Sequence, residues 1–392
     1  MADFAQGKIQ AFVGPKELGA SDNLEQVIVD YIDGAQKYLD IATQEIDSEK
    51  IAQAIIDASW RGIKIRVFIE HDYVFDKVPP KDWADPIPPE TEKEGLRRAK
   101  WKEKRKPKDL KTNRDIHMAL LRNGVDIKAD YNHNHIFHQK FIIRDKRTKN
   151  MKLPTTGVLA GSTNFTWTGT HKNLNHVVIF NDSLIAWQYQ EEFKEIRSGI
   201  FGSANSGHEP KPSTINLGGV PVQILFAPDH APELEIVKQI LKCQSDLHFA
   251  MFTFSGSSGI DDAMISIRKS GKPIRGLVDP VQGAHDWSAT KWLHKEGIEL
   301  FVPHKNKKFG KLHHKLTVVD DDIVVAGSMN YTRPANESND ENIFIIGSPY
   351  DLEIHEGGLV DHAACKEIAD FFHTEIERII KDLSKPWKPK NP

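Results

Sequence analysis

The chain has 392 residues, of which 39% are hydrophobic and 27% are charged, and its formal net charge is −3. This length predicts two domains or one large duplicated domain, and this composition excludes a disordered polyelectrolyte. The overall charge does not indicate a nucleic-acid-binding protein, so any basic surface must be local. The only cysteines, Cys243 and Cys365, exclude a disulfide-rich scaffold and a cysteine-based zinc site.

The N-terminal residues lack the apolar stretch of a secretory signal, and the apolar runs are no longer than strands. A membrane-spanning helix needs about 20 apolar residues. We therefore expect a cytoplasmic protein without stable membrane insertion.

The two halves of the chain repeat the same order of predicted elements. Residues 8–15 and 222–228 are each typical of a short strand ending at a turn, and each is followed by a helix, a strand and a second helix. An apolar strand ending in an acid comes next, with Glu70 in one half and Asp279 in the other. Strands alternating with helices of about 10–15 residues predict an α/β fold around a largely parallel sheet.

The repeats differ in length because the first contains an insertion of about 36 residues, at roughly 74–110. A segment rich in Gly, Ser, Pro and Asn separates the repeats and is typical of a linker. The predicted division is an N-terminal repeat over 1–200, a linker over 201–219 and a C-terminal repeat over 220–385.

Each repeat carries the same polar motif, H-x-K-x4-D followed by G-S-x-N. The motif residues are His138, Lys140, Asp145, Ser162 and Asn164 in the first repeat and His313, Lys315, Asp320, Ser328 and Asn330 in the second. In a strand, residues i and i+2 share a face, so the histidine and lysine of each motif point the same way. Two such sets facing each other suit a phosphodiester: cations and donors bind the phosphoryl oxygens, one imidazole attacks phosphorus, and the other protonates the leaving oxygen.

The paired motif resembles the signature of the phospholipase D superfamily, the HKD enzymes, and the resemblance extends over roughly residues 8–200 and 220–380. It implies an α/β fold of two similar phospholipase D-like α/β/α repeats packed as a pseudo-two-fold dimer. It also implies an active site between the halves, a phosphohistidine intermediate, no cofactor and no required metal. Because one chain supplies both halves, a monomer could be active, and a homodimer is possible.

The resemblance also implies roles for the motif residues. His138 and His313 are the nucleophile and the general acid/base, with His138 favoured as the nucleophile. Lys140, Lys315, Asn164 and Asn330 hold the phosphate, and Ser162 and Ser328 support its pocket. Asp145 and Asp320, grouped with the same pocket, are expected to brace the fold through ion pairs rather than touch substrate.

The family often places an acid about eleven residues beyond the motif asparagine, where it orients a catalytic histidine. Glu341 occupies this place in the second repeat, whereas Asn175 occupies it in the first. A carboxylate raises the basicity of the imidazole that it holds, and an amide oxygen only orients it. We therefore expect the two catalytic histidines to differ in pKa, although the sequence leaves open which of them Glu341 touches.

Histidines near the motifs allow a competing interpretation as a metal site. His133, His135 and His138 could form a ligand cluster, but no carboxylate or cysteine lies at ligand spacing. We therefore predict no metal site there.

Three basic tracts flank the motifs: one in the insertion, one after the first motif and one before the second. The candidate nucleic-acid-binding residues are Arg97, Arg98, Lys104, Arg105, Lys106, Arg147, Lys149, Lys307, Lys308 and Lys311. A polyanionic backbone would gain from such a rim. The tract in the insertion is equally compatible with a solvated helix face.

The leading hypothesis is a metal-independent phosphodiesterase that cleaves nucleic acid, DNA or RNA, in the cytoplasm. The alternative is a phospholipase D or phosphatidyltransferase, which predicts exposed apolar loops or an amphipathic helix near the site. A third hypothesis is a nucleic-acid-binding or defence-complex subunit with a vestigial site, against which the two intact motifs argue.

Overall fold

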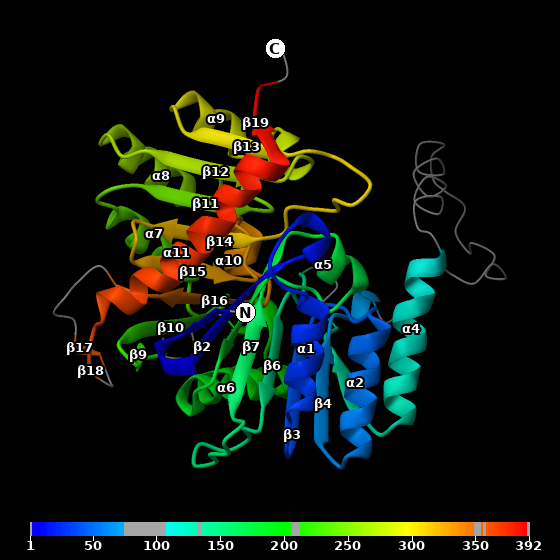
Figure 1. The fold of residues 1–392 in the computed structure, drawn as a ribbon. Coiled ribbons are helices and arrows are strands. Elements are labelled where there is room, and N and C mark those ends of the chain that lie inside the picture. The colour runs from blue at the N-terminus through cyan, green and yellow to red at the C-terminus, as the bar shows by residue number, and fades with distance from the viewer. Residues whose placement is uncertain are drawn as a thin grey trace.

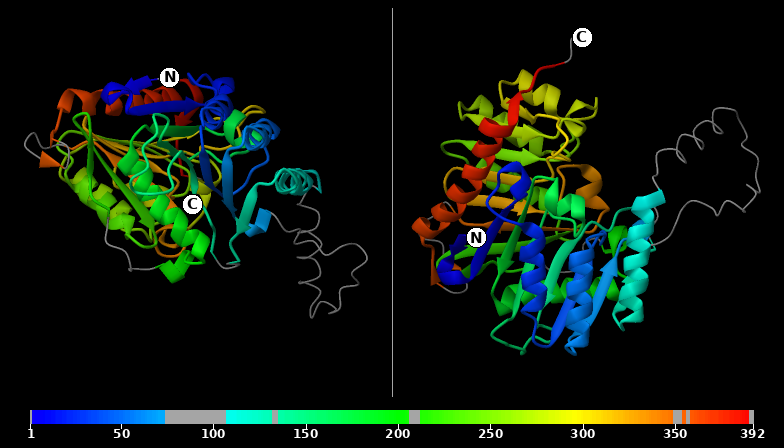
Figure 2. Two further views of the ribbon diagram at one scale, coloured as in Figure 1. Left: turned by 90° about the horizontal axis from the view of Figure 1, so that it is seen from below. Right: turned by 45° about the vertical axis from the view of Figure 1, so that its right-hand side comes forward.

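The computed structural model describes residues 2–73, 107–131, 135–205, 212–348, 354–355 and 358–389. Two large sheets lie in this part of the chain, and helices cover them (Figure 1). The blue and green N-terminal half and the yellow and red C-terminal half pack against each other along their length (Figure 2).

The first sheet belongs to the N-terminal repeat. Its strands are β1 (Ala2–Phe4), β2 (Ile9–Gly14), β3 (Tyr38–Thr43), β4 (Lys64–Ile69), β5 (Asp126–Ala129), β6 (Lys140–Arg144), β7 (Gly157–Gly161) and β8 (Asn175–Phe180). They lie in the order β1-β2-β8-β7-β6-β3-β4-β5.

The second sheet belongs to the C-terminal repeat. Its strands are β9 (Ile215–Leu217), β10 (Val220–Ala227), β11 (Leu247–Met251), β12 (Ile274–Val278), β13 (Glu299–Pro303), β14 (Lys315–Val319), β15 (Ile323–Gly327), β16 (Glu341–Ile346) and β19 (Ser384–Pro386). Read from the β9 edge, the order is β9-β10-β16-β15-β14-β11-β12-β13-β19. A small hairpin of β17 (Ile354–His355) and β18 (Gly358–Leu359) stands apart.

The described helices follow the same repeat. They are α1 (Leu24–Asp33), α2 (Glu49–Trp60), α4 (Pro107–Arg122), α5 (Trp167–His171) and α6 (Ser183–Ser198) in the first half, and α7 (Pro232–Leu241), α8 (Ile260–Lys269), α9 (Thr290–Lys295), α10 (Arg333–Glu337) and α11 (His362–Arg378) in the second. Aspartate side chains cap two of the long helices, since Asp182 accepts from backbone N–H groups at the start of α6 and Asp361 does so at the start of α11. None of the helices within the described ranges is both long and apolar enough to cross a bilayer.

The strand orders confirm the prediction of two similar α/β repeats, because β2-β8-β7-β6-β3-β4-β5 corresponds strand for strand to β10-β16-β15-β14-β11-β12-β13. The prediction of a largely parallel sheet is wrong. Only the β3–β4 and β4–β5 pairs are parallel in the first sheet, and only β11–β12 and β12–β13 in the second. The motif strands and those that follow them are joined without a full crossover helix, which forces antiparallel pairing.

Two predicted segments differ from the structure or lie outside it. Within the expected linker, Ile215–Leu217 form β9, which pairs antiparallel with the following β10. The linker therefore ends earlier than residue 219. Most of the predicted insertion, residues 74–106, lies outside the described residues, and α4 begins at Pro107.

A shared hydrophobic core joins the repeats. Tyr189 of α6 contacts Phe226 of β10 with ring centroids 5.2 Å apart, and Phe180 of β8 contacts Phe344 of β16 at 5.4 Å. Such edge-to-face pairs are favourable beyond the apolar area that they bury. Separate cores lie under the outer helices, with Ile28 and Ile55 in the first repeat and Ile236 and Met264 in the second. The central core fixes the two repeats in one orientation and so determines how their motifs meet.

Candidate active site

Each motif histidine lies in a loop, and the backbone of that loop is hydrogen-bonded to the opposite repeat. The backbone N–H of His138 donates to the carbonyl of Asp340 at 3.0 Å, and that of His313 donates to the carbonyl of Leu174 at 2.9 Å. Asp340 directly precedes Glu341, and Leu174 directly precedes Asn175. Each repeat therefore brings its histidine next to the other repeat's orienting residue.

The acids that end β4 and β12 hold these loops in place. Glu70 Oε2 accepts from the backbone N–H of Phe137 at 2.7 Å, and Asp279 Oδ2 accepts from that of Leu312 at 3.1 Å. Both donors directly precede a motif histidine. The acid directly after each apolar strand, visible in the sequence, thus positions the loop that carries the motif histidine.

His138 contacts the one orienting carboxylate. Its Nδ1 lies 2.7 Å from Glu341 Oε2, and the same oxygen accepts from Ser328 Oγ at 2.6 Å. Glu341 and Ser328 are completely buried. This pairing answers the question that the sequence left open, since Glu341 crosses from the second repeat to the histidine of the first.

His313 has the matching arrangement with an amide. Its Nδ1 lies 3.0 Å from Asn175 Oδ1, which also accepts from Ser162 Oγ at 2.8 Å. The amide nitrogen of Asn175 donates to the carbonyl of Gly169 at 2.8 Å, so the oxygen faces the histidine. Ser162 and Ser328 therefore hold the orienting residues, and being completely buried they support the pocket from behind.

The two motif lysines are buried beside their histidines. Lys140 Nζ donates to the carbonyl of His138 at 2.6 Å, and Lys315 Nζ donates to that of His313 at 2.9 Å. Burial lowers the pKa of Lys140 to about 7, against the opposing carboxylates of Glu341 and Glu45. Burial also lowers the pKa of Lys315 well below its ordinary range, and the charge of Lys140 lowers it further. An anion bound between the lysines would reverse these shifts, because it would favour both ammonium forms.

The histidines share this environment. Burial lowers the pKa of His138, and the charges of Lys140 and Lys315 lower it further. Burial lowers the pKa of His313 too, and the charges of Lys315, Lys140 and His138 lower it further. Burial raises the pKa of Glu341 to about 8. The difference in pKa between the histidines, predicted from their unlike partners, stays a prediction.

The motif asparagines line the same pocket, together with two residues that the sequence did not single out. Asn164 Nδ2 donates to Glu45 Oε1 at 3.2 Å and to Gln44 Oε1 at 3.3 Å. Gln44 and Glu45 directly follow β3, whose last residue, Thr43, pairs with Lys140. Within the described residues, the side-chain oxygens of Asn164 and Asn330 are buried without a hydrogen-bond partner. Buried unpaired polar atoms are typical of a ligand site.

An aromatic residue replaces Gln44 in the second repeat. Phe252 follows β11, and its ring contacts His313 with centroids 4.9 Å apart. Lys315 and Lys311 lie over the same ring, at 4.8 Å and 5.3 Å from its centroid. Lys311 is exposed and its charge lowers the pKa of both motif histidines, so this residue of the third basic tract lies at the pocket. Lys307 and Lys308 are exposed in the same loop.

The motif aspartates lie at the opposite ends of the motif strands. Asp145 follows the last residue of β6 and accepts from the backbone N–H groups of Lys37 and Tyr38, at 2.6 Å and 2.9 Å. Asp320 accepts in the same way from Ser245 and Asp246. Five strand residues separate each aspartate from the site, a distance of roughly 16 Å. The expected place in the phosphate pocket is therefore wrong, and these aspartates brace the fold through backbone amides rather than through ion pairs.

The second basic tract lies at the same far end. Arg147 forms an ion pair with Asp40 at 3.0 Å, and Lys149 lies in the hairpin between β6 and β7. The prediction that these two residues flank the site is therefore wrong, because the hairpin leaves the motif strand at its other end. The insertion candidates Arg97, Arg98, Lys104, Arg105 and Lys106, and His133 of the metal interpretation, lie outside the described residues.

Behind the motif histidines, the next residue of each loop also pairs across the repeats. Gln139 Oε1 accepts from Asn342 Nδ2 at 2.8 Å, whereas the equivalent His314 Nδ1 lies 3.1 Å from His176 Nδ1. Burial lowers the pKa of His176 to about 3 and that of His314 well below its ordinary value. The imidazole pair of His176 and His314 therefore remains neutral in the folded protein. At the equivalent position behind His138, the pair consists of two amides, Gln139 and Asn342.

We predict that this imidazole pair makes stability depend on pH. An unfolded histidine titrates near 6.5, so its lowered pKa in the fold gives stability that is complete above pH 6.5 and lost as the pH falls toward 3. At pH 4.5 the loss from His176 alone is on the order of 3 kcal/mol. Denaturant unfolding of the double variant His176→Asn, His314→Gln, which copies the amide pair, should show a shallower decline between pH 6.5 and 4.5 than wild type. Parallel pH dependences of the two proteins would contradict this.

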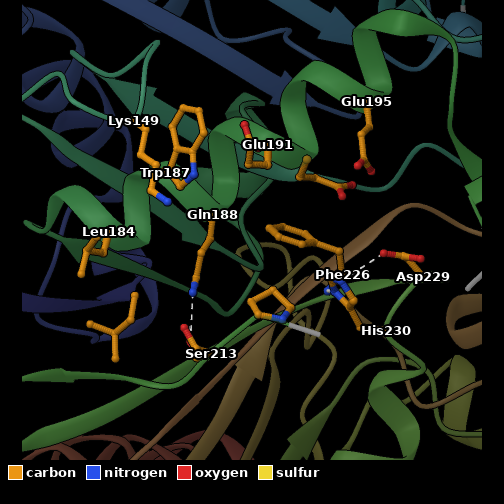
Figure 3. Close-up of a pocket in the computed structure, with 13 residues that line it drawn as sticks. Lys149, Leu184, Trp187, Gln188, Glu191, Glu195, Ser213, Phe226, Asp229 and His230 are labelled. Carbon is orange, nitrogen blue, oxygen red and sulfur yellow. Dashed lines mark hydrogen bonds and ion pairs between the residues drawn. The ribbon is translucent and has the colours of Figure 1, made fainter. Parts of the chain in front are cut away.

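A cavity of about 400 Å³ lies away from the motif residues. Trp187 and Gln188 of α6 face Phe226 and His230 of the second repeat across it, and Lys149 reaches it from the far hairpin (Figure 3). Glu192 also lines it and accepts from Gln139 at 3.1 Å, so one buried contact connects the cavity wall with the catalytic loop.

The fold and the site define a class of protein in which two α/β repeats each contribute one histidine and one lysine to a shared pocket. A family model described as "Cardiolipin synthase, PLD-like domain" matches residues 28–197 and 236–358. The chain belongs to this PLD-like family within the phospholipase D superfamily. Both matched segments contain a complete motif, in agreement with the duplicated fold.

Curated relatives share part of the chain. The mitochondrial cardiolipin hydrolase of Mus musculus is 31% identical over 111 residues, which cover 28% of this chain and 48% of the relative. A phospholipase D of Rickettsia conorii is 27% identical over 125 residues, covering 32% and 60%. The chain thus matches about half the length of the mouse relative. The solved structure of a phosphatidylserine synthase from Haemophilus influenzae Rd KW20 has a TM-score of 0.61 and 12% identity over 99% of this chain and 88% of that one, which establishes likeness of fold alone.

Proposed function

We propose that this protein is a metal-independent phosphodiesterase that cleaves nucleic acid through a covalent phosphohistidine. The observation that carries the proposal is the pair of buried histidine–lysine sets, each oriented by the opposite repeat. Two imidazoles and two ammonium groups supply a nucleophile, an acid and charge stabilisation for a phosphoryl group without further components.

The hydrogen bonds at Nδ1 of both rings leave Nε2 as the reacting atom of each. The negative charge of the bound phosphodiester favours the protonated form of His313, which then carries a proton on Nε2. Nε2 of His138 attacks phosphorus, and the bond to the leaving oxygen breaks as His313 transfers that Nε2 proton to it. Water then attacks the phosphohistidine, His313 takes the proton of the water, and the N–P bond breaks. Glu341 supports the positive charge that His138 gains during attack, which assigns His138 the nucleophilic role.

The rim of the pocket supports a polymeric anion as substrate. Lys307, Lys308 and Lys311 are exposed in the loop that leads to His313. Trp167 at the start of α5 and Trp287 after β12 are also exposed, and both segments follow strand ends on the side of the site. Exposed cations with aromatic rings favour unpaired nucleic acid, because bases stack on the rings while the backbone meets the cations.

The test is incubation of the purified protein with single- and double-stranded DNA and RNA in excess EDTA. Cleavage of at least one substrate is expected, and intact substrate in every case would contradict the proposal. Lys311→Glu should lower kcat/KM on the cleaved polymer by roughly tenfold at low salt, and less on a small chromogenic phosphodiester. Lys149→Glu, at the far end of the motif strand, is the matched control and should cleave like wild type.

A second candidate is hydrolysis of phospholipid head groups. Two observations favour it: the relatives carry names of lipid hydrolases, and the segment after β12 exposes both Val281 and Trp287, as an interfacial enzyme would. Vesicles of cardiolipin or phosphatidylcholine, assayed beside the oligonucleotides, distinguish the candidates. Head-group release without nucleic-acid cleavage would assign the lipid substrate.

A further inference from the structure

Three potential metal ligands converge on the second repeat, at a distance from the catalytic pocket. His373 and Glu377 lie four residues apart on one face of α11, and His248 reaches them from β11. Their ligand atoms all lie within 4.8 Å of one another. Met251, not His248, is the β11 residue that pairs with the catalytic Lys315, so the cluster is roughly 10 Å further along the strand.

The carboxylate of the cluster is held with one oxygen toward the imidazoles. Glu377 Oε2 accepts from Arg275 at 2.6 Å. Glu377 Oε1 is buried, has no hydrogen-bond partner among the described residues, and lies 3.8 Å from His248 Nε2. That separation is too long for a hydrogen bond. The second oxygen is therefore fixed in place without a direct donor.

The spacing suits a shared ion. Nitrogen and oxygen ligands at about 2.0–2.2 Å from one tetrahedral zinc ion lie roughly 3.3–3.6 Å apart. The 3.8 Å between Glu377 Oε1 and His248 Nε2 needs little adjustment. The rings of His248 and His373 are stacked with centroids 4.2 Å apart, so one ring has to rotate to point its nitrogen at the ion. His373 is only half-buried at the helix surface, which leaves room for that rotation.

The first repeat provides an internal comparison. Its residue equivalent to His248 is Asp40, which is neutralised by Arg66 at 2.6 Å and by Arg147 at 3.0 Å. The equivalent arginine of the second repeat, Arg275, is directed to Glu377 and Glu299 instead. The second repeat thus replaces a complete ion pair by two imidazoles and a carboxylate, the ligand types that bind zinc.

We propose that His248, His373 and Glu377 bind one Zn²⁺ that links α11 to the central strand β11. Two imidazoles and one carboxylate leave the fourth tetrahedral position to water. Because α11 packs on the second sheet and reaches β1 of the first, an ion at this place stabilises the contact between the repeats. This site is separate from the catalytic pocket, and its metal takes no part in phosphoryl transfer.

The test uses the full chain, freed of any histidine tag and treated with EDTA, which is then equilibrated with micromolar Zn²⁺ and assayed for bound metal. One equivalent is expected in wild type, together with a rise in Tm on zinc addition. His373→Ala and Glu377→Gln should each weaken binding at least about tenfold and abolish the rise in Tm.

The matched control is His304→Ala, which removes an exposed histidine outside the cluster and should bind zinc like wild type. Circular dichroism of the zinc-free variants checks that each is folded. Absence of zinc uptake by wild type would overturn the proposal. So would equal zinc affinity of His373→Ala and His304→Ala, since the metal would then lie elsewhere.

Discussion

Replacing either His138 or His313 by alanine is expected to reduce turnover of a phosphodiester by on the order of 10³-fold or more. Each ring has a separate task on one phosphorus atom. Apart from His138 at Glu341 and His313 at Asn175, no imidazole among the described residues lies at hydrogen-bond distance from either orienting side chain and could replace the lost ring. Initial rates on a chromogenic phosphodiester measure the loss independently of the natural substrate. His304→Ala controls for loss of a histidine as such.

The two variants should differ in the intermediate that they form. With a good leaving group, which needs little protonation, His313→Ala should still accumulate labelled phosphohistidine, and hydrolysis of that intermediate should be slow. His138→Ala should trap no label after acid quench. Label retained by His138→Ala and lost in His313→Ala would reverse the two roles. Near-normal turnover of either variant would exclude the shared mechanism altogether.

The local half of the site could be predicted from the sequence. The apolar run after Lys140 predicts a buried strand, and β6 does begin at Lys140. His138 lies in the loop before that strand rather than on its face, and Lys140 Nζ donates to the carbonyl of His138. The strand order could also be anticipated as a repeat, because equivalent strands carry equivalent apolar patterns. Both features can be predicted because residues close together in the sequence determine them.

The other half depends on contacts between residues far apart in sequence. Glu341 and His138 are 203 residues apart, and no pattern within either repeat indicates that each histidine is oriented by the opposite one. Glu45 was missed for a related reason, since it belongs to the pocket only through the antiparallel pairing of β3 with β6. The basic hairpin at Arg147 is close to the motif along the chain but not close to the site, because β6 lies between them and places the hairpin at its other end.

Replacing Glu341 by glutamine should lower kcat/KM by roughly 10²-fold while leaving the ring of His138 in place. The amide oxygen can still accept from Nδ1, but it cannot stabilise the positive charge that develops on the imidazole during attack. The variant makes the His138 site resemble that of His313, which already has an amide partner. Because burial raises the pKa of Glu341 to about 8, burying its charge costs free energy, and the glutamine variant should unfold at no lower temperature than wild type.

The pH profile separates this role from a structural one. Ionisation of Glu341 near pH 8 should give the wild-type kcat/KM profile a rising limb that Glu341→Gln lacks. The falling limb from Lys140, whose pKa is about 7, should be present in both proteins. Asn175→Ala is the matched change at the other histidine. It removes orientation but no titrating group, so it should cost less and keep the rising limb. A larger loss of kcat/KM in Asn175→Ala than in Glu341→Gln would assign the nucleophilic role to His313. The reason is that the nucleophilic ring gains the most charge on the way to the phosphohistidine, so loss of its hydrogen-bond partner should reduce kcat/KM most.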